Sequence, residues 1–171
     1  VLTPILFRND LKSLRDLAHA RALIEGELAA EAAARRSQED LRILDEILSS
    51  SAEVLDDPKA YADLDFRFHR QVAHMAGNVF LAVMWEGLAS HILGFLAEFA
   101  KDREARVAAL KRHRPLLQAI TEQDPDAARK LARSHLAPCL AHYEKRLQAE
   151  TQSAKPGMRD DVRGQRRRTA M

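Results

Sequence analysis

The sequence predicts an all-α fold. Apolar residues recur at intervals of three and four through most of the 171 residues, which is the spacing of one face of an α-helix. Proline and glycine, which interrupt helices, number only six each. No segment shows the alternation of apolar and polar residues that is typical of a half-buried strand. A chain of this length is expected to form one domain with a substantial core.

Capping residues set the boundaries of the first three expected helices. The first helix is expected over about residues 10–35. Ser37, followed three residues later by Asp40, predicts a capping box that starts a second helix over "QEDLRILDEILSS". Asp57 is the expected N-cap of the third helix, and Pro58 then occupies the first helical position, where a proline is tolerated.

Three further helices follow. Gly77 is expected to end the third helix as a left-handed cap. A fourth helix is expected from residue 79 to about residue 100, and a fifth over roughly 104–123. The sixth begins with a second Asp-Pro start, in "DPDAARKLARSHLAPCLAHYEKRL". Beyond about residue 150 the composition turns polar, so packing is expected to stop there.

The charge of the chain is nearly balanced but unevenly placed. Lys and Arg number 27 against 25 for Asp and Glu, and residues 155–171 hold six basic and two acidic residues, a sum of +4. Residues 1–154 therefore sum to −2, since the whole chain is +2. A slightly acidic body lacks the footprint of a nucleic-acid-binding surface. Residues 151–171 are expected to be a flexible, solvated tail.

Cysteine usage and hydropathy bear on location. The single cysteine, Cys139, has no partner for an internal disulfide, which suits a cytoplasmic protein. The longest apolar stretch, residues 78–100, is interrupted by two glutamates and a histidine, so we expect no membrane span. The chain begins with valine, and we therefore expect a fragment or a processed form.

The third expected helix directs two ionisable side chains toward the core. At about 100° per residue, Asp65 and His69 lie on the same face as Tyr61, Phe68 and Val72. An unpaired carboxylate in the middle of a buried face costs several kcal/mol, on the order of 2–5. Asp65 therefore needs a cation.

Two later helices repeat this placement. His113 is surrounded at helical spacing by Ala109 and Leu117, and His135 by Leu131 and Cys139. One carboxylate and three imidazoles suit a divalent transition metal, zinc first, with nickel, manganese or iron as the other candidates. Four protein ligands would close the coordination of zinc, whereas an octahedral ion would keep two positions for water or a carboxylate.

A purely structural interpretation competes with the metal site. A histidine on an apolar face commonly bonds a backbone carbonyl in the core, and the chain contains seven histidines. Arg21 lies on the apolar face of the first helix, where Glu25 could neutralise it as a structural ion pair. Asn78 has the position of an N-cap for the fourth helix, and His91 either lines a pocket or is simply buried.

Four segments resemble the FCD domain, the effector-binding and dimerisation domain of FadR-type regulators in the GntR superfamily. They are "ARALIEGELAAEAAARR", "DLDFRFH", "HMAGN" and "HRPLLQAITEQDPDAARKLARSHL". Each is loose alone, but their order and spacing are specific, including the 22-residue step between His113 and His135. The resemblance covers about residues 10–150.

The resemblance implies an antiparallel bundle of about six to seven helices that encloses a metal and ligand pocket. It implies that the metal ligands are those listed here: Asp65, His69, His113 and His135. It also implies a small organic acid as effector, with Arg21 as a clamp on its carboxylate and with Asn78 near the ligand. His91, which shares a helical stripe with Leu88 and Phe95, is our third candidate for an effector-binding residue. We expect a homodimer. DNA would be bound only through an N-terminal winged-helix domain, which is absent here, and residues 1–9 resemble the end of the linker to it.

Two prolines depart from the family pattern. Pro115 lies two residues after His113, and Pro138 lies three residues after His135. Each removes a backbone donor and is expected to kink or shift its helix. The direction in which the His113 and His135 imidazoles point depends on the extent of that shift.

Three functions are compatible with these residues. The leading hypothesis is a ligand-sensing domain of a transcriptional regulator, without enzymatic activity. The alternative is a small helical metal-dependent hydrolase or isomerase, which would need an open metal position and a nearby general base. Glu25 is the only unassigned carboxylate expected on an inward face, so the sequence offers little for that chemistry. The third is a structural bundle whose polar groups pair with one another.

Overall fold

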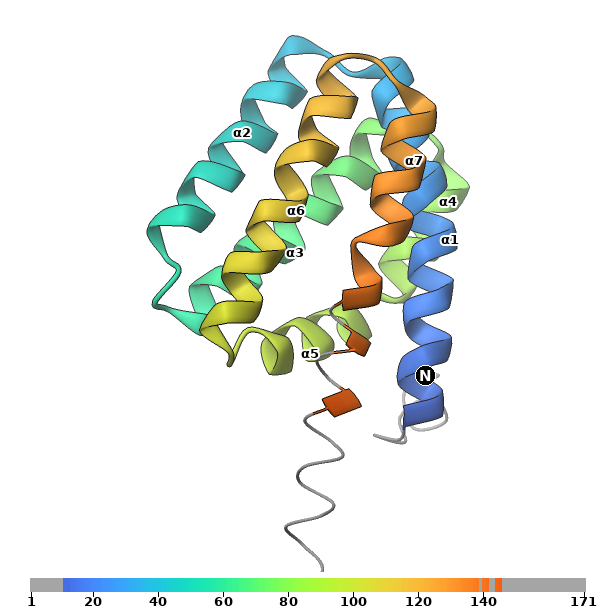
Figure 1. Cartoon of the computed structure of the whole chain (residues 1–171). Coiled ribbons are helices and arrows are strands. Elements are labelled where there is room, and N and C mark those ends of the chain that lie inside the picture. The colour runs from blue at the N-terminus through green and yellow to red at the C-terminus, as the bar shows by residue number, and fades with distance from the viewer. Residues whose placement is uncertain (1–10, 139, 142–143, 146–171) are drawn as a thin grey trace, which may run out of the picture.

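The computed structural model describes residues 11–138, 140–141 and 144–145, and within them it contains seven helices and no strands (Figure 1). The helices are α1 (Leu11–Arg35), α2 (Gln38–Glu53), α3 (Pro58–Met75), α4 (Val79–Gly87), α5 (Ala89–Phe99), α6 (Arg103–Thr121) and α7 (Pro125–Ser134). The all-α prediction is confirmed. The expected linker over residues 1–9, the tail over 151–171 and Cys139 lie outside the described residues.

The helices form a bundle in which most chain neighbours run in opposite directions. α7 packs along α1, α2 packs against α3, and α6 contacts both α2 and α7 (Figure 1). α3 also packs against α1, so it lies inside the bundle. α5 crosses one end of the bundle (Figure 1). This arrangement brings α3, α6 and the end of α7 to a common interior.

Side-chain caps begin the helices as the sequence predicts. Ser37 and Asp40 form the capping box of α2, since the Asp40 amide donates to Ser37 Oγ at 3.1 Å and the Ser37 amide donates to Asp40 Oδ2 at 3.1 Å. Asp57 accepts from the amides of the first turn of α3. Gly77 has a φ of 66°, a left-handed conformation that glycine adopts without strain, and it follows α3 as expected.

The expected single helix over residues 79–100 is wrong, because the chain forms α4 and α5 with a bend of 56° between them. The amide of Leu88 donates to the carbonyl of Trp85 at 2.9 Å, a tighter turn than an α-helix makes. Gly87 just before it lowers helix propensity. No single described helix is long and apolar enough to cross a membrane; α4 and α5 together reach the length and composition, but they are bent.

The two prolines near the histidines have different effects. α6 continues through Pro115 without interruption. α7 ends at Ser134, and His135 lies in a turn before helical geometry resumes at Leu136. Pro138 has no amide hydrogen to donate to the Ser134 carbonyl, which accounts for the break at this point. The helix is therefore interrupted at His135, whereas it continues beyond His113.

A buried arginine joins the helices that carry the site. Arg106, in the first turns of α6, donates through Nε to the carbonyl of Leu55 at 2.8 Å and through Nη1 to the carbonyl of Ala100. The Tyr61 hydroxyl on α3 donates to the carbonyl of Arg106 at 3.0 Å. These bonds satisfy buried polar groups and fix α3 against α6.

Candidate metal centre

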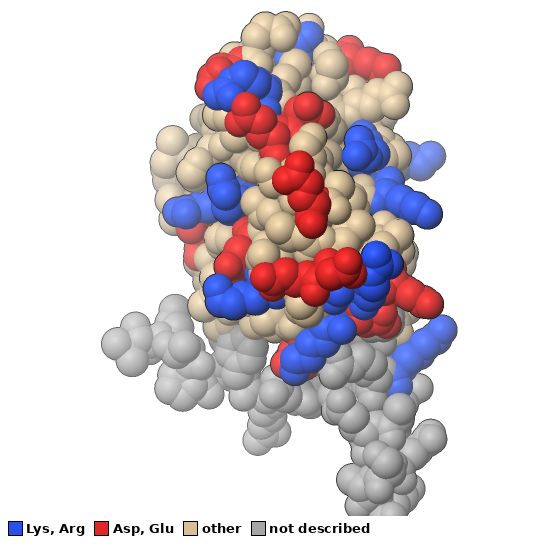
Figure 2. Space-filling model, turned by 90° about the vertical axis from the view of Figure 1, so that its left-hand side faces the viewer, with Lys and Arg blue, Asp and Glu red and all other residues tan. Residues whose placement is uncertain are grey.

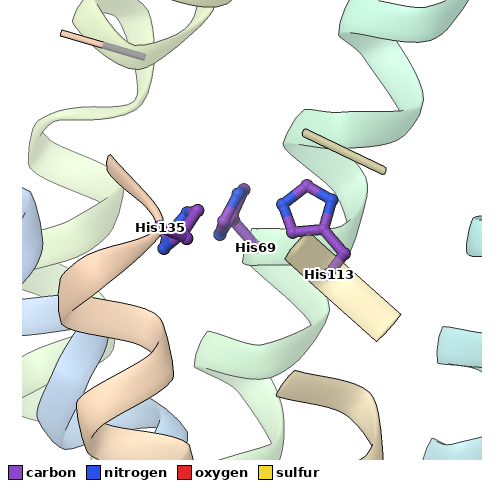
Figure 3. A group of neighbouring side chains, drawn as sticks. All are labelled: His69, His113 and His135. Atoms are coloured by element: carbon purple, nitrogen blue, oxygen red, sulfur yellow. The ribbon is translucent and has the colours of Figure 1, made fainter. Parts of the chain in front are cut away.

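Three buried histidines converge in the interior of the bundle (Figure 3). His69 comes from the middle of α3, His113 from α6, and His135 from the turn after α7. Each offers one ring nitrogen such that all three nitrogens lie within 4.8 Å of one another. The side chains are 2% to 5% exposed. The convergence predicted for these three residues is therefore present.

His69 occupies the centre of the group. Its ring centroid lies 4.8 Å from that of His135, in a stacked arrangement, and 5.0 Å from that of His113, edge-on (Figure 3). Phe68 covers the group from one side, since its ring centroid lies 4.6 Å from that of His113. Burial behind apolar side chains such as Phe68 keeps the three histidines away from solvent. Electrostatic interactions within the group are stronger there than in water.

Two buried carboxylates flank His69. Asp65 Oδ2 lies 4.0 Å from His69 Nε2, and Asp65 Oδ1 lies 3.5 Å from His113 Nδ1. On the other side, Glu25 Oε2 lies 3.2 Å from His69 Nδ1 and 3.8 Å from His135 Nε2. Asp65 Oδ1 accepts no hydrogen bond from the described residues. Asp65 is thus placed beside two imidazoles, and Glu25 joins the group from α1.

The tautomer of His135 follows from its backbone contact. Nδ1 of His135 lies 2.5 Å from the carbonyl of Ala132, and a carbonyl can only accept. Nδ1 therefore carries the hydrogen in the neutral ring, which leaves the lone pair on Nε2, directed into the group. A histidine fixed in this way by a backbone carbonyl is ready to bind a metal.

Arg21 pairs with Glu25, which is one of the two alternatives that the sequence left open. The Arg21 side chain is 1% exposed, and its Nε donates to Glu25 Oε1 at 2.7 Å. Trp85 Nε1 donates to the same oxygen at 3.2 Å. Nη2 of Arg21 has no hydrogen-bond partner among the described residues. The guanidinium also lies 5.9 Å from the ring centroid of Phe95.

A narrow crevice, with no room inside it for a water molecule, adjoins Arg21. Its lining is apolar apart from this arginine: Leu14, Leu17, Ala18, Arg21, Phe95 and Leu136. Leu136 directly follows His135 in the chain, so the crevice lies beside the histidine group. A contact between Arg21 and an effector stays a prediction.

The other two predicted effector-binding residues lie on α4 and α5. Asn78 caps α4, since its Oδ1 accepts from the Leu81 amide at 3.2 Å, and its Nδ2 donates to Glu31 at 3.3 Å. The predicted capping role is confirmed. His91 is buried on α5, which packs against α3. Their effector-binding roles stay predictions.

Burial governs the protonation of the group. Burial lowers the pKa of His135 to about 3, and burial together with the neighbouring His69 and His135 lowers the pKa of His113 well below its usual value. Burial likewise raises the pKa of Asp65. Burial would also raise the pKa of Glu25, but the Arg21 guanidinium and the neighbouring His69 outweigh it and hold this pKa well below its usual range.

These shifts predict that the metal-free protein loses stability in mild acid. Below about pH 6.5 the unfolded chain protonates His113 and His135 while the native state keeps them neutral, so unfolding takes up protons and becomes easier as the pH falls. Glu25 adds to this loss below about pH 4.5, whereas the raised pKa of Asp65 opposes it. Two histidines give a loss of about 4 kcal/mol between pH 7 and pH 5.

Urea unfolding in the presence of a chelator, at pH 7 and at pH 5, measures this loss. A His74→Ala variant serves as the control, because His74 lies on α3 but is exposed; it should show the same pH dependence as the wild type. A free energy of unfolding that is equal at both pH values would contradict the buried, neutral histidines.

The residues present fit a divalent transition metal. Three imidazole nitrogens lie within 4.8 Å of one another, a donor set that suits such an ion, and Asp65 lies beside two of the rings. The buried Asp65 Oδ1, which accepts no hydrogen bond from the described residues, also favours a bound cation. The sequence did not reveal the contact of Glu25 with His69, because 44 positions separate the two residues.

Comparisons with known proteins agree with the fold and the sequence motifs. The family model of the FCD domain matches residues 16–138. A protein from Paenarthrobacter nicotinovorans, described as a probable D-xylose utilization operon transcriptional repressor, is 29% identical over 149 residues, which cover 84% of this chain and 65% of that protein. The HTH-type transcriptional repressor NanR of Salmonella typhimurium is 26% identical over 119 residues, 68% of this chain and 45% of that protein.

Solved structures show the same fold. Streptococcus agalactiae GntR superposes with a TM-score of 0.63 at 24% identity, covering 81% of this chain and 63% of that one. E. coli McbR/YncC superposes with a TM-score of 0.71 at 18% identity, covering 79% and 69%. The chain spans about half to two thirds of the length of the repressors it matches. These curated relatives are described as transcriptional repressors, and the chain described here belongs to the FCD domain family.

Proposed function

We propose that this chain is the effector-sensing domain of a bacterial transcriptional regulator, which binds a divalent metal and a small organic carboxylate. The observation that carries the proposal is the convergence of three buried imidazoles and Asp65 beside the buried cation of Arg21. The effector would modulate DNA binding by an attached winged-helix domain. Relatives described as HTH-type repressors, longer than this chain, support that arrangement. The whole regulator would act in the cytoplasm.

The metal ligands in this proposal are His69, His113, His135 and Asp65. Zinc is the first candidate for the ion, and nickel, manganese and iron are the others, because imidazole suits all of them and one carboxylate adds charge neutralisation. When bound, the ion would act as a Lewis acid that attracts an effector carboxylate. An octahedral ion would leave two positions for that carboxylate after four protein ligands.

Arg21 would supply the second contact to the effector. Its Nη2 has no hydrogen-bond partner within the part of the chain that the structure describes, and its side chain lines the crevice next to Leu136. A guanidinium binds a carboxylate well because its hydrogens match the two oxygens. To act as a signal, the acid must bind two arrangements of the helices with different affinity, typically by about 1–3 kcal/mol.

A metal and ligand screen tests the proposal. The purified chain is stripped with a chelator, reloaded with zinc, nickel, manganese or iron(II), and its thermal unfolding is followed with two- to six-carbon acids. We expect one metal to raise the Tm, and a carboxylic acid to raise it further only in the loaded protein. Amides of the same acids are the matched controls. Failure of all four metals to bind would refute the metal-dependent sensor.

The face on which α2 lies does not favour direct binding to nucleic acid. Figure 2 shows acidic and basic side chains interspersed over the face on which α2 lies. A DNA-binding face would instead present a patch of basic residues. This agrees with DNA contacts made by another domain.

The exposed apolar side of α4 supports a homodimer. Phe80 is 84% exposed, and Val79, Val83 and Met84 on the same helix are also exposed. Contiguous apolar surface of this kind commonly marks an interface. We propose that α4 packs against a second copy of this chain.

Charge placed on that helix is expected to separate the copies. Phe80→Glu should convert a dimer to a monomer in sedimentation velocity, because a buried unpaired carboxylate costs several kcal/mol, on the order of 3–5. Ser49→Glu, on an exposed position of α2, is the matched control and should sediment like the wild type. A wild-type chain that stays monomeric at high concentration would contradict the interface.

A further inference from the structure

The two ring nitrogens of His69 face two different carboxylates at different distances. Nδ1 lies 3.2 Å from Glu25 Oε2, whereas Nε2 lies 4.0 Å from Asp65 Oδ2. A neutral imidazole has one N–H and one lone pair, so its two nitrogens have different roles. Which carboxylate receives the N–H decides which nitrogen can bind a metal.

The shorter distance suits a direct hydrogen bond. A separation of 3.2 Å lies at the upper end of the range for an N–H donor and an oxygen acceptor. A separation of 4.0 Å is too long for such a bond, but it can hold an ion about 2 Å from each atom. The geometry therefore places the hydrogen on Nδ1 and the lone pair on Nε2, on the side of Asp65.

Glu25 is itself held in place by two hydrogen bonds to its other carboxylate oxygen. Its Oε1 accepts from Arg21 Nε at 2.7 Å and from Trp85 Nε1 at 3.2 Å, which leaves Oε2 for His69. The guanidinium keeps the carboxylate ionised in the core, and an ionised carboxylate can only accept. All three side chains are buried.

We infer that Glu25 is a positioning residue of the metal centre, which accepts the Nδ1 hydrogen of His69 and so directs Nε2 to the ion. This inference rests on the proposed metal site and adds to it a chain of contacts from Arg21 through Glu25 to a ligand. Carboxylates that orient ligating histidines raise the basicity of the ring, and their loss typically weakens metal binding about 10–100-fold.

The zinc affinity of Glu25→Gln, measured by competition with a chelator, tests the inference. An amide can donate to Nδ1 and so favour the wrong tautomer, and we expect zinc to bind about 10–100-fold more weakly. Glu31→Gln is the matched control, since Glu31 lies on the same helix but pairs with Arg35 at the surface; it should bind zinc like the wild type. Equal affinity in Glu25→Gln and the wild type would overturn the inference.

A second variant guards against a folding defect. Glu25→Gln leaves the charge of Arg21 without its partner, so Arg21→Met/Glu25→Gln removes that charge as well. We expect this double variant to fold, by circular dichroism, and still to bind zinc weakly. Wild-type affinity in the folded double variant would overturn the inference.

The spectrum of the cobalt-substituted protein separates positioning from direct coordination. If Glu25 orients His69, the visible bands of bound cobalt(II) should keep the intensity of the wild type in Glu25→Gln, because the ligands are unchanged. A change that indicates loss of an oxygen ligand would overturn the positioning role in favour of coordination by Glu25. A wild-type chain that binds no metal would instead refute the proposed function itself.

Discussion

The Asp65→Ala/His69→Ala variant is expected to contain no bound metal after purification. Asp65 and His69 lie on one face of α3, and His69 is central to the group (Figure 3). Removing both leaves two imidazoles, a donor set with far lower affinity for a divalent ion. Elemental analysis and titration with zinc measure the loss. Thermal stabilisation by carboxylic acids should disappear in the same variant.

His74→Ala is the matched control for this experiment. His74 lies on the same helix, but it is exposed and 3.8 Å from the surface carboxylate of Glu86. The control should retain wild-type metal content. If the double variant binds metal as the wild type does, the ion does not lie among these residues.

Replacement of Arg21 by methionine is expected to destabilise the protein by about 3–5 kcal/mol. The change leaves Glu25 as a buried carboxylate without its cation, since the pair lies in the core with side chains 1% and 6% exposed. The expected loss is a large fraction of the stability of a typical domain. Urea unfolding of the metal-free protein measures it.

Replacing Glu25 as well should restore the free energy of unfolding that Arg21→Met loses. In Arg21→Met/Glu25→Leu both charges are absent, and apolar pairs of similar volume often replace buried ion pairs without a net cost. Lys12→Met is the surface control, because Lys12 and Asp16 form an exposed pair on the same helix, and such pairs contribute little. A small effect of Arg21→Met alone would mean that Glu25 finds another cation in the core.

Local sequence signals predicted most of the fold and the inward placement of His69 and His113. Ser37, Asp57 and Gly77 determine helix ends through bonds within a few residues, so they can be found without tertiary structure. The inward faces of the helices with His69 and His113 follow from helical periodicity in the same way.

The features that were missed depend on packing between distant segments. The apolar pattern of residues 79–100 runs on across the bend at Leu88, so periodicity alone does not reveal the bend. The direction of α5 depends instead on its packing against α3. The contact of Glu25 with His69 likewise joins α1 to α3. Periodicity showed that Glu25 faces inward, but it could not show which side chain it meets.

The placement of the three histidines in distant segments of the chain has a consequence for turnover of the protein. In an unfolded chain, bringing positions 69, 113 and 135 together would require closing loops of 44 and 22 residues, at a cost in chain entropy. The unfolded chain should thus hold the ion poorly, and a hundredfold excess of metal over its Kd would favour the native state by about 2.7 kcal/mol. Resistance to proteases should then rise and fall with the supply of the ion.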